Sequence, residues 1–81
     1  MIQVYPSNRD ELERQKWQQA KWSTIKQEDL IALSLRNGTV AVGTVDDHTS
    51  DRSVFWLWLS QTGERRYFLS AEVTGAWAPP Q

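Results

Sequence analysis

The chain lacks cysteine altogether and has a single histidine among its 81 residues. It can therefore form no disulfide and no thiolate metal site, and one histidine does not make a zinc site within one chain. We expect neither a metal nor another cofactor. A domain this small buries only about 60–65% of the surface that its unfolded chain exposes, and disulfides, metals or self-association usually stabilise such domains. Self-association remains, so we expect a homo-oligomer.

An excess of one charge is also missing, and so are long apolar runs. Nine lysines and arginines stand against ten aspartates and glutamates, a formal net charge of -1, which gives no general attraction to nucleic acid. No apolar run approaches the roughly 18–20 residues of a membrane-spanning helix. The opening residues, MIQVYPSNRDELER, have neither the basic nor the apolar region of a secretory signal. We expect a cytoplasmic protein without a membrane partner.

The N-terminal part, residues 1–29, predicts an arm followed by a helix. Residues 1–6, MIQVYP, are apolar enough for a short edge strand or a loose arm. The helix is expected over residues 7–22, with Ser7 or Asn8 as its N-cap, acidic residues in its first half and lysines later. The apolar side chains of this segment do not share one stripe at a period of 3.6 residues. They are Leu12, Trp17, Ala20 and Trp22.

From Leu30 onward the apolar residues recur with a period of two, which predicts strands. Asn37-Gly38 and Thr62-Gly63 predict tight hairpin turns, and the first pair suits the positive φ angles of a type I′ turn. Gly43, inside the second strand, indicates a sharp bend or a close backbone approach. Residues 46–52, DDHTSDR, are expected to form a polar loop.

The strand pattern predicts one domain that is mainly β with an N-terminal helix. Five short antiparallel strands in meander order are expected over residues 30–77, followed by a tail at 78–81 that does not enter the sheet. So few residues favour a small barrel, because closure removes unpaired strand edges.

Two stretches, LSLRNGTVAVGTVDD and GERRYFLSAEVTGAW, resemble the Sm-like and SH3-like small barrels. The resemblance covers residues 28–77 and implies a five-stranded antiparallel barrel. It also implies a tendency of the fourth strand of one copy to pair with the fifth strand of a neighbour. The RNA pocket of Sm-like proteins resembles an Asp–x–apolar–x–Asn pattern, whereas DDHTSDR contains no asparagine. The resemblance therefore does not imply RNA binding.

The stretch SVFWLWLS, residues 53–60, provides the main candidate surface. If Phe55, Leu57 and Leu59 fill the barrel, Trp56 and Trp58 point outward and form an apolar patch of a size that monomers seldom leave open. Three covers are considered. The N-terminal helix could lie across the patch through Trp17 or Trp22, another subunit could bind it, or it could be a surface for a ligand or partner protein.

Arg65 and Arg66, next to Tyr67 and Phe68, form the one basic and aromatic cluster of the sequence. Arginine beside aromatic rings suits single-stranded nucleic acid, which is held through phosphate contacts and base stacking. The simpler interpretation is an ordinary strand in which one arginine is solvated and the other pairs with Glu64, Glu72 or Asp51. Because the chain has no basic excess, nucleic acid is the less favoured partner.

Catalysis is not expected. Asp46, Asp47, His48 and Asp51 lack the spacing of a calcium loop, and no nucleophile triad, phosphate loop or dinucleotide pattern occurs. The sequence thus predicts a non-catalytic binding or scaffolding module that self-associates, with single-stranded RNA binding as the alternative. The candidate interaction residues are Trp17, Trp56, Trp58, Arg65, Arg66 and Tyr67.

Overall fold

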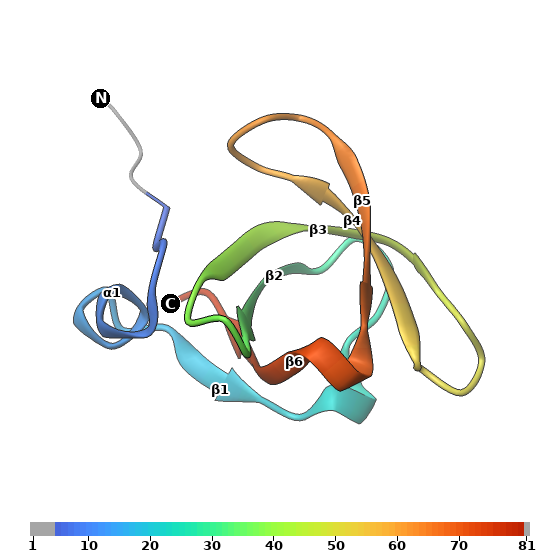
Figure 1. The fold of residues 1–81 in the computed structure, drawn as a ribbon, viewed down its shortest axis with the longest axis horizontal. Helices are drawn as coiled ribbons and strands as arrows, with labels where there is room; N and C mark the ends of the chain where they lie inside the picture. The colour runs from blue at the N-terminus through green and yellow to red at the C-terminus, as the bar shows by residue number, and fades with distance from the viewer. Residues whose placement is uncertain (1–4, 81) are drawn as a thin grey trace.

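The computed structural model describes residues 5–80 and shows six antiparallel strands in one sheet with one short helix (Figure 1). The strands are β1 (Gln18–Ala20), β2 (Leu30–Leu35), β3 (Val40–His48), β4 (Val54–Leu59), β5 (Arg65–Leu69) and β6 (Val73–Ala78). The helix is α1 (Arg9–Arg14), and two short 3₁₀ turns are η1 (Trp22–Thr24) and η2 (Ser70–Glu72). No helix within residues 5–80 has the length and apolar character needed to cross a membrane.

The sheet is open, so the expected five-stranded barrel is wrong. The strand order is β1-β6-β2-β3-β4-β5, which leaves β1 and β5 at the two edges. Closure would require β5 to pair with β6, but the outer edge of β6 is occupied by β1, with Gln18 opposite Ala78 and Ala20 opposite Ala76. Ala78, expected in the tail, is therefore a paired strand residue. The mainly β class and the meander order of β2 to β5 agree with the sequence prediction.

The helix ends at Arg14, eight residues before the predicted end at Trp22. Asn8 is the N-cap, as expected, and its side-chain oxygen accepts a hydrogen bond from the Glu11 N–H at 3.0 Å. At the other end Lys16 adopts a φ of 67°, the N–H of Lys16 bonds to the Glu13 carbonyl, and the N–H of Trp17 bonds to the Leu12 carbonyl. These two bonds are a Schellman motif, which usually has glycine where Lys16 stands. The stop signal was therefore absent from the sequence.

The hairpin between β2 and β3 forms where it was predicted, but its turn is not type I′. Only Gly38 of the pair has a positive φ, 88°. The Asn37 side chain instead accepts hydrogen bonds from the backbone N–H and the hydroxyl of Thr39, at 3.0 and 2.6 Å, which fixes Asn37 in a turn of its own. The second predicted turn is confirmed, because Gly63 has a φ of 74° and its N–H bonds to the Leu59 carbonyl.

Two apolar clusters lie on opposite sides of the sheet. Alternate residues of β2 to β6 fill the larger, inner cluster, which contains Ile25, Ile31, Leu33, Val45, Phe55, Leu57, Phe68 and Ala76. The N-terminal segment contributes Leu12 and Trp17 to a smaller, outer cluster with Ala32, Val42 and Trp77. The segment thus covers the outer side of β2, β6 and the start of β3. In Figure 1, α1 lies beside β1, on the opposite side of the molecule from β4 and β5.

Strand β3 crosses β4 closely and then continues further than predicted. Gly43 is paired with Leu59, and a Cβ at Gly43 would overlap the carbonyl group of Trp58. The close backbone approach predicted from this glycine is confirmed. A bulge leaves Asp46 without a paired residue, after which Asp47 pairs with Trp56 and the strand runs on to His48. Residues 46–48 are therefore strand and not loop, because the bulge restores the register.

Candidate interaction surface on strands β4 and β5

All three large hydrophobic side chains that are exposed within residues 5–80 lie on one side of two neighbouring strands. Phe55 and Leu57 are fully buried in the inner cluster, as predicted, so Trp56 and Trp58 point outward. Trp58 is 47% exposed, and on β5 Tyr67 is 59% and Leu69 45% exposed. We name this surface the β4–β5 face. Its residues are Val54, Trp56, Trp58, Arg65, Tyr67 and Leu69.

Cross-strand pairing sets the arrangement of the β4–β5 face. Trp56 is opposite Tyr67, Trp58 is opposite Arg65, and Val54 is opposite Leu69. Directly opposed side chains on one side of an antiparallel pair are in contact range. The Arg65 guanidinium carbon also lies 5.6 Å from the centre of a Trp56 ring, a cation–π contact. The aromatic rings and the aliphatic part of Arg65 thus form one continuous patch.

Asp46 neutralises the positive charge of the β4–β5 face. The bulge in β3 places its carboxylate beside β4 and β5, where the Arg65 Nε donates to Asp46 Oδ2 at 2.7 Å. Hydrogen bonding from Arg65, and secondarily from Trp58, lowers the pKa of Asp46. The carboxylate is therefore ionised at neutral pH, and Arg65 is not a free cation. One arginine is paired, as the simpler interpretation held, but the partner is not one of the three carboxylates considered.

Arg66 lies on the opposite side of the sheet from Arg65 and Tyr67. It is paired with the buried Leu57, and its guanidinium carbon is 5.5 Å from the Phe68 ring centre. Neighbouring residues of a strand point to opposite sides, so the two adjacent arginines do not form one basic patch. Of the residues predicted to interact, the structure brings together Trp56, Trp58, Arg65 and Tyr67, and it separates Arg66.

The N-terminal tryptophans do not cover the β4–β5 face, so the first of the three covers considered from the sequence is wrong. Trp17 follows the Schellman motif into the outer cluster against Ala32, Val42 and Trp77. Trp22 packs edge-on against Phe55, with ring centres 4.5 Å apart, at the inner cluster. The early end of the helix is the cause, because it sends the chain along β6 and not across β4.

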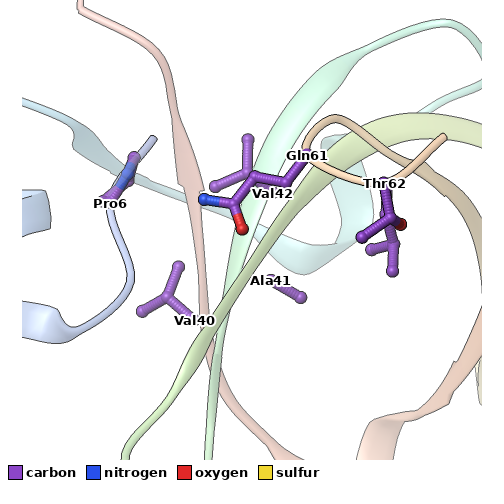
Figure 2. A pocket seen from close by; sticks show the side chains of 7 residues that line it. Pro6, Val40, Ala41, Val42, Gln61 and Thr62 are labelled. Carbon is purple, nitrogen blue, oxygen red and sulfur yellow. The ribbon is translucent and has the colours of Figure 1, made fainter. Parts of the chain in front are cut away.

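Several hollows occur on the described part of the chain, among them one of about 550 Å³ beside the charged residues of α1 and Lys16 and one of about 310 Å³ between β1, Ile25 and the start of β2. A cleft of about 100 Å³ lies between the N-terminal segment, the first residues of β3 and the β4–β5 turn. Figure 2 shows the Gln61 side chain reaching from that turn toward Pro6. Small-molecule sites usually have volumes of about 300–1,000 Å³. A second cleft, of about 280 Å³, is lined by Trp22 and by residues of η2 and β6. The exposed large hydrophobic side chains gather on the β4–β5 face and line none of these hollows, so that face is the better candidate for an interaction site.

The polar residues at the end of β3 and between β3 and β4 mainly hydrogen-bond to one another and so stabilise this connection. The Asp51 carboxylate accepts hydrogen bonds from the hydroxyls of Ser53 and Thr49, both at 2.8 Å, and these bonds lower its pKa. His48 Nδ1 lies 2.8 Å from the Thr49 carbonyl oxygen. Across residues 5–80, no three acidic, histidine or cysteine side chains are grouped so that they could hold a metal ion.

The sequence prediction missed Leu69 of the β4–β5 face and the neighbouring Asp46 that pairs with Arg65. Leu69 shares the period of two with Arg65 and Tyr67 in ERRYFLS, so alternation alone could have placed it on the same side. Asp46 reaches Arg65 through the bulge, and no local pattern in the sequence announces that bulge.

Strand pairing, alternation and one bulge thus create an exposed aromatic surface at the edge of an open sheet. Comparison of the chain with protein-family models, with curated proteins and with solved structures found no match.

Proposed function

We propose that the chain is a non-catalytic binding or scaffolding module that associates with itself through its β4 and β5 strands. The observation that carries the proposal is the gathering of Trp58, Tyr67 and Leu69 on one surface at the sheet edge. Exposed apolar patches rimmed by polar residues mark protein interaction sites, and tyrosine and tryptophan are enriched in such sites. The outer cluster is covered by the chain's own N-terminal segment, whereas no part of the described residues 5–80 covers Trp58, Tyr67 and Leu69.

The proposal includes a relationship to the SH3-like and Sm-like small barrels. In its support, β2 to β5 follow meander order and the last strand, β6, returns to pair with β2. The open sheet would then be a variant in which β1 occupies the edge that closure requires. A cytoplasmic location is also part of the proposal, and it is supported by a sequence without cysteine.

The test is the absolute mass of the protein in solution. Light scattering during size exclusion, over about a hundredfold range of protein concentration, should show a rise above 9.4 kDa with concentration. The variant Trp58→Ser should remain nearer the monomer mass at every concentration, because it removes the largest exposed ring of the patch. A wild-type mass of 9.4 kDa throughout would reject self-association.

A matched control separates loss of the surface from loss of fold. Gln19 is an exposed residue of β1, at the opposite edge of the sheet. Gln19→Ser should leave the concentration dependence unchanged. Both variants are compared with the wild type by urea unfolding, so that a lower mass is counted only for a folded protein. An equal shift of mass in both variants would contradict the role of Trp58.

Single-stranded RNA binding is the alternative. It is favoured by Arg65 lying among Trp56, Trp58 and Tyr67, and it is weakened by the Asp46 carboxylate and by the separation of Arg66. A fluorescent single-stranded oligouridine is the probe. Binding that weakens steeply with salt, and that Arg65→Ala removes, would support the alternative. Anisotropy that stays at the free-probe value would reject it.

A further inference from the structure

The edge of β5 opposite β4 offers backbone groups to another strand. The Leu59 N–H donates to the Glu64 carbonyl, and the Ser70 N–H donates to the Ser53 carbonyl, both at 2.8 Å. Bonded residues alternate along an antiparallel strand, so Arg66 and Phe68 also direct their peptide groups toward β4. The peptide groups of Arg65, Tyr67 and Leu69 therefore point away from β4, toward the free edge.

One of these groups is already occupied. Glu72 Oε1 accepts a hydrogen bond from the Leu69 N–H at 3.1 Å. The free edge groups are the N–H and carbonyl of Arg65 and the N–H and carbonyl of Tyr67, whereas the carbonyl of Leu69, the N-cap of η2, accepts the first bond of that turn and keeps one lone pair. Such a row of polar groups on an edge strand is a template for pairing with a further strand.

We propose that β5 pairs antiparallel with β5 of a second copy of this chain, with Tyr67 on the twofold axis. The proposal rests on the proposed self-association and adds its geometry. Tyr67 is the middle residue of Arg65–Leu69, so full overlap of two antiparallel copies places Tyr67 opposite Tyr67 and Arg65 opposite Leu69. Two backbone hydrogen bonds then form between the tyrosines, and two more can run from the Arg65 N–H groups to the second lone pairs of the Leu69 carbonyls, about four in all.

Charge along β5 favours this arrangement. Arg65 and Arg66 are at the beginning of the strand, and Glu72 lies just beyond its end. Antiparallel pairing brings the basic end of one copy toward the acidic end of the other. A shift of the axis by one residue would place Arg66 opposite Arg66, and directly opposed like charges are destabilising. The aliphatic part of Arg65 would cover the exposed Leu69 of the second copy.

The other edge of the sheet is a poorer partner. Pairing of β5 with β6 of a neighbour, which the barrel resemblance implies, meets β1 over residues 76–78. The outer edge of β1 itself has only three residues, two of them exposed glutamines. Pairing of β5 with itself uses five residues on each side and gives a closed, two-fold symmetric dimer.

Cysteine cross-linking tests the register, because the natural chain has no cysteine. Opposed residues of a hydrogen-bonded pair have Cα atoms about 5.5 Å apart, within the usual range of a disulfide. Tyr67→Cys should form a covalent dimer in oxidised glutathione. Arg66→Cys is the matched control on the same strand, because its two copies would be diagonal, about 7–8 Å apart. It should give at least about tenfold less dimer.

A charge variant tests the same axis without oxidation. Tyr67→Lys should raise the dimer dissociation constant at least about tenfold, because two lysines would face each other. Thr62→Lys, at the exposed tip of the β4–β5 turn, adds the same charge off the axis and should leave the constant unchanged. Sedimentation velocity measures both, and urea unfolding confirms that both variants fold.

The outcomes separate the register from self-association. If the wild type dimerises but Arg66→Cys cross-links as well as Tyr67→Cys, the register is wrong and the proposed function stands. The same conclusion follows if Tyr67→Lys leaves the dissociation constant unchanged. If the wild type is a monomer at every concentration, both proposals are rejected. Preferential Tyr67→Cys cross-linking together with a weakened Tyr67→Lys dimer supports the pairing.

Discussion

Trp22 and Arg52, thirty positions apart in the sequence, hydrogen-bond to each other in both directions. The Trp22 indole Nε1 donates to the Arg52 carbonyl at 3.0 Å, and the Arg52 guanidinium donates to the Trp22 carbonyl at 3.2 Å. The same guanidinium nitrogen also donates to the carbonyl of Ile25. The connection between β3 and β4 is therefore tied to η1, and it holds the Trp22 ring against Phe55 at the inner cluster.

Arg52→Ala is expected to destabilise the protein by about 1–3 kcal/mol, because two partly buried carbonyl groups lose their donor. Arg52 also has a φ of 60°, which costs a residue with a side chain about 1–2 kcal/mol. Arg52→Gly should therefore be less harmful than Arg52→Ala. Urea unfolding measures both, with Arg66→Ala as the control. A larger loss for glycine than for alanine would contradict this explanation.

Gly43→Ala is expected to cost about 1–3 kcal/mol, because the added methyl group overlaps the Trp58 carbonyl and forces β3 and β4 apart. Gly38→Ala is the comparison. Gly38 has open space around it and a positive φ, so its cost of about 1–2 kcal/mol comes from the backbone alone. Thermal unfolding and the near-ultraviolet circular dichroism of the tryptophans should distinguish them. Unchanged tryptophan signals in Gly43→Ala would argue against the overlap.

Lys16→Gly is expected to stabilise the protein by about 0.4–1 kcal/mol, because it relieves backbone strain and keeps the Schellman hydrogen bonds. Lys16 holds a φ of 67° at the helix end, a conformation that glycine adopts without strain. Glu13→Gly is the contrasting control. It should destabilise the protein by about 1 kcal/mol, because Glu13 lies within α1. The midpoints of urea unfolding of the two variants and the wild type measure these stability changes. A loss of stability in both variants would mean that α1 does not end at this motif.

The pairing of Asp46 with Arg65 should make the free energy of unfolding depend on pH in the acidic range. Because hydrogen bonding lowers the pKa of Asp46 in the folded protein, its contribution is fully present above the unfolded pKa of about 3.9. It is lost as the pH falls through the lower, folded pKa. Asp46→Asn should therefore lower the urea midpoint slightly at neutral pH and converge with the wild type in strong acid. In an Arg65→Gln background the same substitution should have a smaller effect at neutral pH.

Much of the fold could be predicted where local patterns determine it. Alternation placed Phe55 and Leu57 inside and Trp56 and Trp58 outside, and Gly43 marked a close crossing. The predicted helix is too long because its real end depends on the positive φ of Lys16. Lysine does not indicate such a conformation in a sequence, whereas glycine would. Trp17 and Trp22 do not share a helical stripe with Leu12, and this already indicated that the helix does not reach them. Strand β1 followed from the early helix end, and with it the open sheet.

The site was predictable in composition but not in arrangement. The aromatic residues of β4 and β5 were recognised from their spacing, and Leu69 could have been added from the same period. The pairing of Arg65 with Asp46 could not, because it depends on a bulge in β3 and on a contact across nineteen positions of sequence. Whether Trp17 and Trp22 could cover the β4–β5 face depends on the path of the chain after α1. That path is set by tertiary packing and not by a local pattern in the sequence.

The short strand β1 has a consequence for growth into polymers. A sheet with two usable edges can add copies at both ends without limit, whereas a sheet with one usable edge can form only a closed pair. Residues 18–20 occupy the edge of β6, where their backbone pairing and the packing of Leu12 and Trp17 before them hold them. If the N-terminal segment detaches, the outer side of β2 and β6 and a second edge become exposed together. While the N-terminal segment stays attached, the edge of β6 is thus closed to a second copy of the chain.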